Sequence, residues 1–236
     1  MSSLLTPHRR RGHEILDDPN VCDELRARSL ADVARSNTMF GGSRAVQEEL
    51  AMVLEGSSAT SVSLLDVGTG IGDIPAQAAE SWRARGVNIT TFGVDISPSL
   101  LRDARARGLI PVCADALALP IATKSVDIVI CSQTLHHFEG RDAITVLREL
   151  DRVARTRVIV SDIRRSWLAA AGIWLASYPL HFHPVSRHDG VVSVLRGFTP
   201  GELRQLVHTA TAQTPVARRR LGFRTTASWK PQTLAA

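Results

Sequence analysis

The chain has 236 residues, of which 44% are hydrophobic and 22% charged, as in ordinary globular proteins. This composition excludes wholesale disorder and predicts one large domain with a sizeable core. The net charge of +5 comes from basic residues scattered along the chain, whereas a nucleic-acid footprint needs a clustered stripe, so we expect no nucleic-acid partner. The three cysteines lack a CxxC spacing, and we therefore expect neither a disulfide framework nor a bound metal.

No targeting or membrane-spanning segment is expected. The basic residues near the N-terminus are not followed by an apolar run, so no signal peptide is predicted. The longest weakly polar stretch, residues 167–180, falls short of the roughly 20 residues that a membrane span needs. We therefore expect a cytoplasmic protein.

Residues 1–55 are predicted to form a helical N-terminal cap. Apolar residues recur at helical spacing over 25–34, and the Gly41-Gly42 pair separates this helix from a second one. From residue 56 the pattern changes, which places the start of another unit there.

Short apolar runs alternate with helical segments over residues 56–236, which predicts an α/β core. Several runs are apolar on both sides, as in parallel strands that helices cover on each face. The pattern favours a doubly wound, mostly parallel sheet. Residues 163–198, after the fifth run, form a lid-like insertion. The five runs are 63–67, 91–95, 111–114, 126–131 and 158–161.

Residues 64–73 read Leu-Leu-Asp-Val-Gly-Thr-Gly-Ile-Gly-Asp, a buried strand that leads through a glycine turn into a helix. Such a turn lets a ligand approach the backbone and aims helix N-terminal amides at it. A dinucleotide fold would place its third glycine at position 73, where Asp73 would face the pyrophosphate. The spacing therefore disfavours a nicotinamide oxidoreductase.

Polar residues follow the next three strands, at the sheet edge where such folds bind ligands. Asp95 ends the second strand, where a carboxylate can accept both hydroxyls of a ribose. Asp115 and Ala116 follow the third strand. Residues 131–138, Cys-Ser-Gln-Thr-Leu-His-His-Phe, follow the fourth.

The Gly68-x-Gly70-x-Gly72 spacing, with these three segments in register, resembles class I S-adenosylmethionine-dependent methyltransferases. The D-A-x-x-L-P and L-H-H segments are similar to the ubiquinone/menaquinone-biosynthesis-like small-molecule branch, and the resemblance covers roughly residues 60–165. It implies a seven-stranded, Rossmann-like sheet and S-adenosyl-L-methionine as the cofactor. The cofactor residues that it implies are Asp66, Gly68, Thr69, Gly70, Gly72, Asp95, Ile96, Asp115, Ala116 and Gln133.

The acceptor is expected to be a small molecule. The segment after the fourth strand lacks the Asn/Asp-Pro-Pro-aromatic motif with which amino-methyltransferases of nucleic acids grip a flipped base. Five-methylcytosine enzymes resemble one another in a proline that precedes their cysteine nucleophile, whereas Cys131 follows Ile130. We therefore expect Cys131 to be a buried strand residue.

Trp167, Trp174 and Tyr178 share one helical face in the insertion. This face either packs on the core or forms the wall of an apolar pocket, and the two interpretations are compatible. As an acceptor wall it would work with Arg196, which could orient the acceptor.

Methyl transfer from a sulfonium is an in-line displacement, for which alignment of the reactants can suffice. A phenolic acceptor would gain from a histidine base, for which His137, His183 and His188 are candidates, although each could equally be structural. We expect O- or C-methylation of an aromatic or lipophilic acceptor by a monomer or homodimer. A non-catalytic or regulatory S-adenosylmethionine-binding protein and an RNA methyltransferase are the alternatives.

Overall fold

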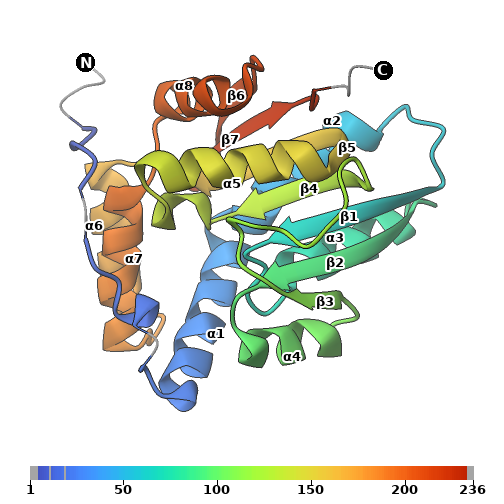
Figure 1. The fold of residues 1–236 in the computed structure, drawn as a ribbon. Helices are drawn as coiled ribbons and strands as arrows, with labels where there is room; N and C mark the ends of the chain where they lie inside the picture. Colours follow the sequence, from blue (N-terminus) through green and yellow to red (C-terminus); the bar gives the residue numbers. More distant parts are fainter. Residues whose placement is uncertain (1–4, 11, 19, 233–236) are drawn as a thin grey trace.

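The computed structural model describes residues 5–10, 12–18 and 20–232. Seven strands form one sheet in the order β3-β2-β1-β4-β5-β7-β6 (Figure 1). The first five strands run parallel, and β7 pairs antiparallel with β5 and β6. The strands are β1 (Ser61–Val67), β2 (Asn88–Asp95), β3 (Ile110–Cys113), β4 (Val126–Ser132), β5 (Ala154–Ile163), β6 (Val216–Arg220) and β7 (Arg224–Trp229).

Helices connect the strands and cover the sheet. The capping box that Thr199 and Glu202 form starts α8, whereas Ser97 stands at the start of α4 without a side-chain bond to the helix backbone. The helices are η1 (Ile15–Asp17), α1 (Asp23–Met39), α2 (Gly42–Leu54), α3 (Asp73–Arg83), α4 (Pro98–Ala106), η2 (Leu135–His137), α5 (Gly140–Val153), α6 (Trp167–Ala176), α7 (Pro184–Arg196) and α8 (Pro200–Thr211).

The sheet separates two apolar cores, because alternate residues of each strand point to opposite faces. In β4, Ile128 and Ile130 pack against α2 and α3, whereas Val129 and Cys131 pack against α5 and α8. Cys131 is fully buried, as predicted. The sheet is therefore covered on both faces, which confirms the doubly wound fold.

The structure divides the predicted N-terminal cap. Helix α2 packs on the sheet through Val46 and Leu50, so it belongs to the helical layer of the core, and only α1 lies over the sheet edge (Figure 1). The seven-stranded, mostly parallel sheet that the resemblance implied is present. The apolar pattern did not mark β6 and β7 because β6 is rich in arginine and β7 in small polar residues.

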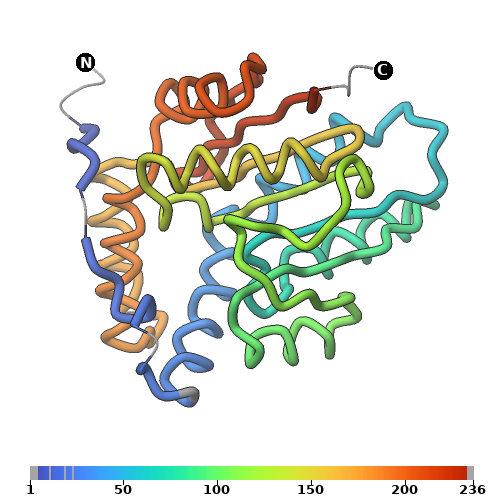
Figure 2. Tube along the Cα trace, viewed as in Figure 1, coloured from blue at the N-terminus to red at the C-terminus, as the bar shows by residue number. Residues whose placement is uncertain are grey.

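The predicted insertion forms the hairpin of α6 and α7, which stand side by side at one end of the sheet (Figure 1). The N-terminal segment, of which residues 5–10 and 12–18 are described, runs along this hairpin (Figure 2). Its backbone is tied there, because Ile15 N and Leu16 N donate to the Asp189 carboxylate at 2.9 and 3.0 Å. Among the described residues, no helix has the length and apolarity to cross a membrane.

The turn that follows β6 packs against the turn at Phe40, beside the sheet edge. Gly222, with a φ of 68°, follows β6, and a Cβ at this position would lie 1.8 Å from the carbonyl oxygen of Phe40. Gly86 has a similar φ of 82°, but a Cβ there would meet no atom within 4 Å. The two glycines therefore share one backbone conformation and differ in crowding.

We expect Gly222→Ala to lower the free energy of unfolding by about 3 kcal/mol or more, because it adds a backbone clash to the cost of a left-handed alanine. Gly86→Ala should cost only the latter, about 1–2 kcal/mol. Urea denaturation of both variants measures the difference. Equal losses would show that the Phe40 turn yields without cost.

Candidate active site

A cavity of about 810 Å³ opens at the carboxyl ends of the strands, between the sheet edge, α1 and the α6–α7 hairpin. The arrows of β1, β2 and β4 point toward the side of the sheet on which α1, α6 and α7 lie (Figure 1). One half is lined by the glycine turn and the segments after β2, β3 and β4. The other half is lined by the N-terminal segment, α1, α6 and α7. A volume of about 810 Å³ is within the range of small-molecule sites.

The glycine turn is built for close backbone approach. Gly68, Gly70 and Gly72 have φ values of 75°, 55° and 75°, which side-chain-bearing residues rarely adopt. A Cβ on Gly68 would lie 2.3 Å from the Thr134 side chain, so the turn packs directly on the segment after β4. Gly70 faces the cavity and has no neighbour within 4 Å of its Cβ position.

Two carboxylates are positioned by the backbone beside this turn. Asp95 accepts hydrogen bonds from Gly70 N and Ser97 N, each at 2.9 Å. Asp115 accepts one from Leu117 N at 2.9 Å. Both carboxylates line the cavity and keep further acceptor capacity, because an ionised carboxylate has about four acceptor sites.

Asp66 at the end of β1 is a third carboxylate of this half. It is buried, and only Oδ2 has a partner, the Thr69 hydroxyl at 3.0 Å, whereas Oδ1 has none. Burial raises the pKa of Asp66 to about 7, the Thr69 bond opposes the shift, and the charges of Asp73 and Asp95 add to it. The site therefore holds an acid that a cationic ligand group would ionise.

Polar side chains connect α1 to the sheet edge. The Gln133 amide donates to Asn37 Oδ1 and accepts from the buried Arg224. Asn37 in turn donates to Asp73 at 3.2 Å. Burial lowers the pKa of Arg224 to about 10, against the attraction of Asp162. This network fixes Gln133, which has a left-handed φ of 54°.

The end of β5 contributes a buried acid–base pair in the other half. Asp162 Oδ1 lies 2.7 Å from His136 Nδ1, and Asp162 Oδ2 accepts from His136 N at 3.0 Å. The pKa of Asp162 is lowered, because the attraction and hydrogen bonds of His136 outweigh the cost of burial. His136 lines the cavity, and its Nε2 has no hydrogen-bond partner in the described part of the chain.

The N-terminal segment brings further charges to this pair. Glu14 is buried with Oε1 3.7 Å from His136 Nε2, and Arg196 donates to that oxygen at 3.0 Å. Asp17 Oδ1 lies 3.1 Å from His137 Nδ1. Burial lowers the pKa of His137, but the nearby Asp17 and Glu14 carboxylates raise it by more than burial lowers it. The net shift of the His137 pKa is therefore upward. This half of the cavity attracts positive charge.

Nine of the ten predicted cofactor residues line the cavity, and Gly72 does not. Gly72 precedes α3, where a Cβ would lie 2.9 Å from Leu109 Cδ2, so its role is close helix packing. The motif correctly located this glycine, but it could not distinguish ligand contact from packing contact.

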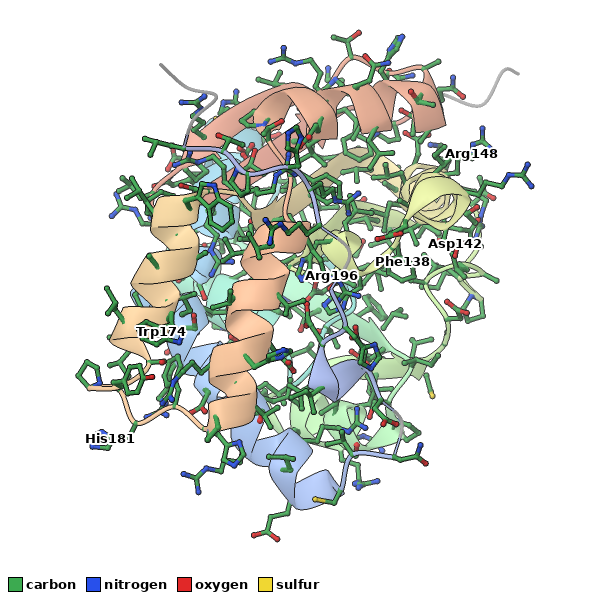
Figure 3. The ribbon with its side chains drawn as sticks, turned by 90° about the vertical axis from the view of Figure 1, so that its left-hand side faces the viewer. Phe138, Asp142, Arg148, Trp174, His181 and Arg196 are labelled. Carbon is green, nitrogen blue, oxygen red and sulfur yellow. The ribbon has the colours of Figure 1, made fainter. Side chains whose placement is uncertain are left out.

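The predicted acceptor residues lie elsewhere. Trp167, Trp174 and Tyr178 are 42%, 46% and 48% exposed and do not line the cavity; Trp174 stands at the outer side of α6 in Figure 3. The prediction was wrong because α6 is apolar on every side, so its periodicity does not indicate the inward face. That face carries Leu168, Ala169, Gly172 and Ile173.

Arg196 also lies outside the cavity lining, between α7 and the N-terminal segment (Figure 3). Its guanidinium is paired with Glu14 and Asp17 and holds them to α7. This partnership joins residues distant in the chain, and nothing in the local sequence indicates it.

Of the predicted bases, only His137 lines the cavity. His183 Nδ1 caps α7 by accepting from Val185 N at 3.2 Å, and the exposed His188 binds Asp189. His136 was not among the predicted bases, because its buried partner Asp162 lies outside the segments that carry the resemblance. A carboxylate at the end of the fifth predicted run was the signal that could have indicated this pair.

Comparison with known proteins agrees with this geometry. Residues 65–160 match the methyltransferase domain family. A demethylmenaquinone methyltransferase of Roseiflexus sp. (strain RS-1) is 33% identical in an alignment over 118 residues that covers 47% of this chain and 47% of the relative. The match thus spans about half the length of that relative.

Two solved structures show the same fold. Magnesium protoporphyrin IX methyltransferase from Synechocystis PCC 6803, with bound S-adenosylmethionine, has a TM-score of 0.54 at 14% identity, over 93% of this chain and 89% of its own. The plantazolicin methyltransferase, in complex with a desmethyl analogue and S-adenosylhomocysteine, has a TM-score of 0.62 at 16% identity, over 83% and 72%. Residues 65–160 thus match a methyltransferase domain, and both structures share the fold of this chain.

The raised pKa of Asp66 makes stability depend on pH. The folded protein keeps this proton up to about pH 7, whereas the unfolded chain releases it near pH 4, so the free energy of unfolding should fall as pH rises between these values. The slope of one group is at most about 1.4 kcal/mol per pH unit. Asp66→Asn should remove this contribution, which denaturation at pH 5, 6, 7 and 8 measures. Parallel wild-type and variant curves would contradict the assignment.

Proposed function

We propose that this protein transfers a methyl group from S-adenosyl-L-methionine to a small aromatic or lipophilic acceptor. The observation that carries the proposal is the arrangement of Asp66, Asp95 and Asp115 around the glycine turn at the carboxyl edge of β1, β2 and β3. The cofactor is cationic at its sulfonium and amino groups and carries ribose hydroxyls. Three acceptor-rich carboxylates suit these groups.

Each carboxylate has a stated task in this proposal. Asp95, already oriented by Gly70 N and Ser97 N, accepts the ribose hydroxyls. Asp115 accepts the adenine amine. Asp66 Oδ1, buried and without a partner, accepts the amino group of the methionine part, and this cation would ionise the carboxyl.

The second half of the cavity takes the acceptor. Its apolar lining from α6, with Phe138 and Phe223, suits a flat or lipophilic molecule. Glu14, His136 and His137 stand at this end and can assist the loss of a proton from the acceptor. The similar proteins named above are methyltransferases of demethylmenaquinone, magnesium protoporphyrin IX and plantazolicin, which supports a small acceptor and leaves O- and C-methylation as two forms of the proposal.

Asp95→Asn should weaken cofactor binding by roughly 10- to 100-fold, the scale of about 1.5–3 kcal/mol for a hydrogen bond to a charged group. The exposed Asp103→Asn on α4, outside the cavity, is the matched control and should bind as wild type does. Isothermal titration with S-adenosylmethionine and S-adenosylhomocysteine measures both. Unchanged affinity in Asp95→Asn would exclude the ribose contact.

Gly172→Leu tests the acceptor half. Gly172 lines the cavity from α6, and a Cβ there meets nothing within 4 Å, so leucine enters the cavity without a backbone clash. We expect kcat/KM for methyl transfer to a panel of phenols and quinols to fall at least about tenfold, while cofactor affinity stays within about twofold.

Gly201→Leu is the matched control, because Gly201 is an exposed helical glycine of α8 whose Cβ position is equally open. It should leave turnover unchanged. A wild-type protein that binds the cofactor but methylates no acceptor in the panel or in a metabolite extract would favour the regulatory alternative. Equal loss of cofactor binding and turnover in Gly172→Leu would place the acceptor elsewhere.

A further inference from the structure

Three metal-ligating side chains converge in the acceptor half of the cavity. The ligand atoms of Glu14, His136 and His137 all lie within 4.8 Å of one another. Glu14 Oε1 is 3.7 Å from His136 Nε2, and Glu14 Oε2 is 3.9 Å from His137 Nε2. Each carboxylate oxygen thus faces one imidazole, and all three residues line the cavity.

His136 supplies an observation that points to a ligand. Its side chain is 2% exposed, and its Nε2 has no hydrogen-bond partner among the described residues. Because the Asp162 carboxylate only accepts, the bond at 2.7 Å uses the proton on Nδ1, so Nε2 is the ring nitrogen that is left to bind a ligand. A buried polar atom without a partner is costly, and a metal ion bound to Nε2 of the neutral ring would remove that cost.

Both imidazoles are oriented in the way that metal-ligating histidines usually are. Nδ1 of His136 bonds to Asp162, and Nδ1 of His137 lies 3.1 Å from Asp17 Oδ1. A carboxylate on the remote nitrogen fixes the ring and raises the basicity of the ligating nitrogen. Both rings therefore present Nε2 to the Glu14 carboxylate.

The distances are close to those of an occupied site. Metal–ligand bonds of about 2.0–2.2 Å place adjacent ligand atoms roughly 3.0–3.5 Å apart. The separations of 3.7 and 3.9 Å exceed this by a few tenths of an ångström, which small side-chain rotations can close. Ser193 and Arg196 both donate to Glu14 Oε1, which holds the carboxylate in place. The guanidinium also opposes a second cation, so we expect moderate affinity.

The geometry points to a binding site for one divalent transition-metal ion, such as Zn²⁺, Fe²⁺ or Co²⁺, on Glu14, His136 and His137. Imidazole and carboxylate ligands suit these ions, and three protein ligands leave coordination positions open to the cavity. Resting on the proposed function, this site specifies the acceptor class as an aromatic compound with two adjacent oxygens, which can chelate the ion.

The metal would assist methyl transfer without changing the stoichiometry of the reaction. Coordination lowers the pKa of an acceptor hydroxyl, and its proton passes to water. The bound oxygen then forms a bond to the methyl carbon while the carbon–sulfur bond breaks. The electron pair of that bond goes to sulfur, which loses its positive charge, and no group is oxidised or reduced.

Cobalt titration of metal-free, tag-free protein tests the site directly. Co²⁺ is spectroscopically visible, and we expect visible d–d absorption that saturates at one equivalent and is displaced by Zn²⁺. His136→Gln, His137→Gln and Glu14→Gln should each weaken binding at least tenfold. His188→Gln is the matched control, because His188 also contacts a carboxylate but lies outside the cavity, and it should bind as wild type does.

Thermal unfolding with and without Zn²⁺ separates misfolding from loss of a ligand. The His137 ring is 32% exposed, so His137→Gln should fold, and its unfolding temperature should no longer rise with Zn²⁺. The absence of stoichiometric Co²⁺ binding in wild type, or equal affinity in the ligand variants and His188→Gln, would overturn the site.

Calorimetry of the metal-free protein with S-adenosylmethionine keeps the two proposals apart. Cofactor binding without cobalt binding would overturn the metal site alone. Cobalt binding without cofactor binding would support the metal site and contradict the proposed function. Methyl transfer to an ortho-dihydroxy aromatic should fall at least tenfold after chelation of the metal and return with Zn²⁺ or Co²⁺.

Discussion

The organisation of the site depends on buried carboxylates at the ends of strands that are otherwise apolar. Asp66 closes β1 and Asp162 lies near the end of β5, each almost without solvent contact. A charge in such a place needs partners. Asp162 is bonded to His136 from η2 and to the backbone amide of Ile163, whereas Asp66 is bonded to the Thr69 hydroxyl. The pKa of Asp162 is lowered against the cost of burial, whereas burial raises the pKa of Asp66 to about 7, so a cationic ligand beside Asp66 would favour its ionised form.

The elements outside the sheet bring further charged groups to the buried residues at the strand ends. The N-terminal segment places Glu14 beside His136, and the segment is secured at Asp189 and Arg196 of α7. The α6–α7 hairpin is therefore less an isolated lid than the support on which the N-terminal residues are held. The cavity closes around two chemically different halves because one half is made by the sheet edge and the other by these added segments.

The local sequence predicted the cofactor half of the site, because the end of a strand, a glycine turn and the start of a helix follow one another within a few residues. The glycine spacing, Asp95 and Asp115 could be placed without coordinates for that reason. The acceptor half could not, because its contacts join Glu14 to His136 and Arg196 across most of the chain. The aromatic residues of α6 misled for a different reason: a helix that is apolar all round gives no direction, and Trp174 faces outward while Ile173 faces in.

The hydrogen bond between Arg196 and Glu14 spans 182 positions of the chain. A ribosome therefore releases Glu14 long before the residues of α7 that hold it exist. The sheet from β1 to β5 can form during synthesis, since each of these strands after β1 pairs with a strand that precedes it in the chain. The part of the cavity that contains Glu14 must therefore wait for α7.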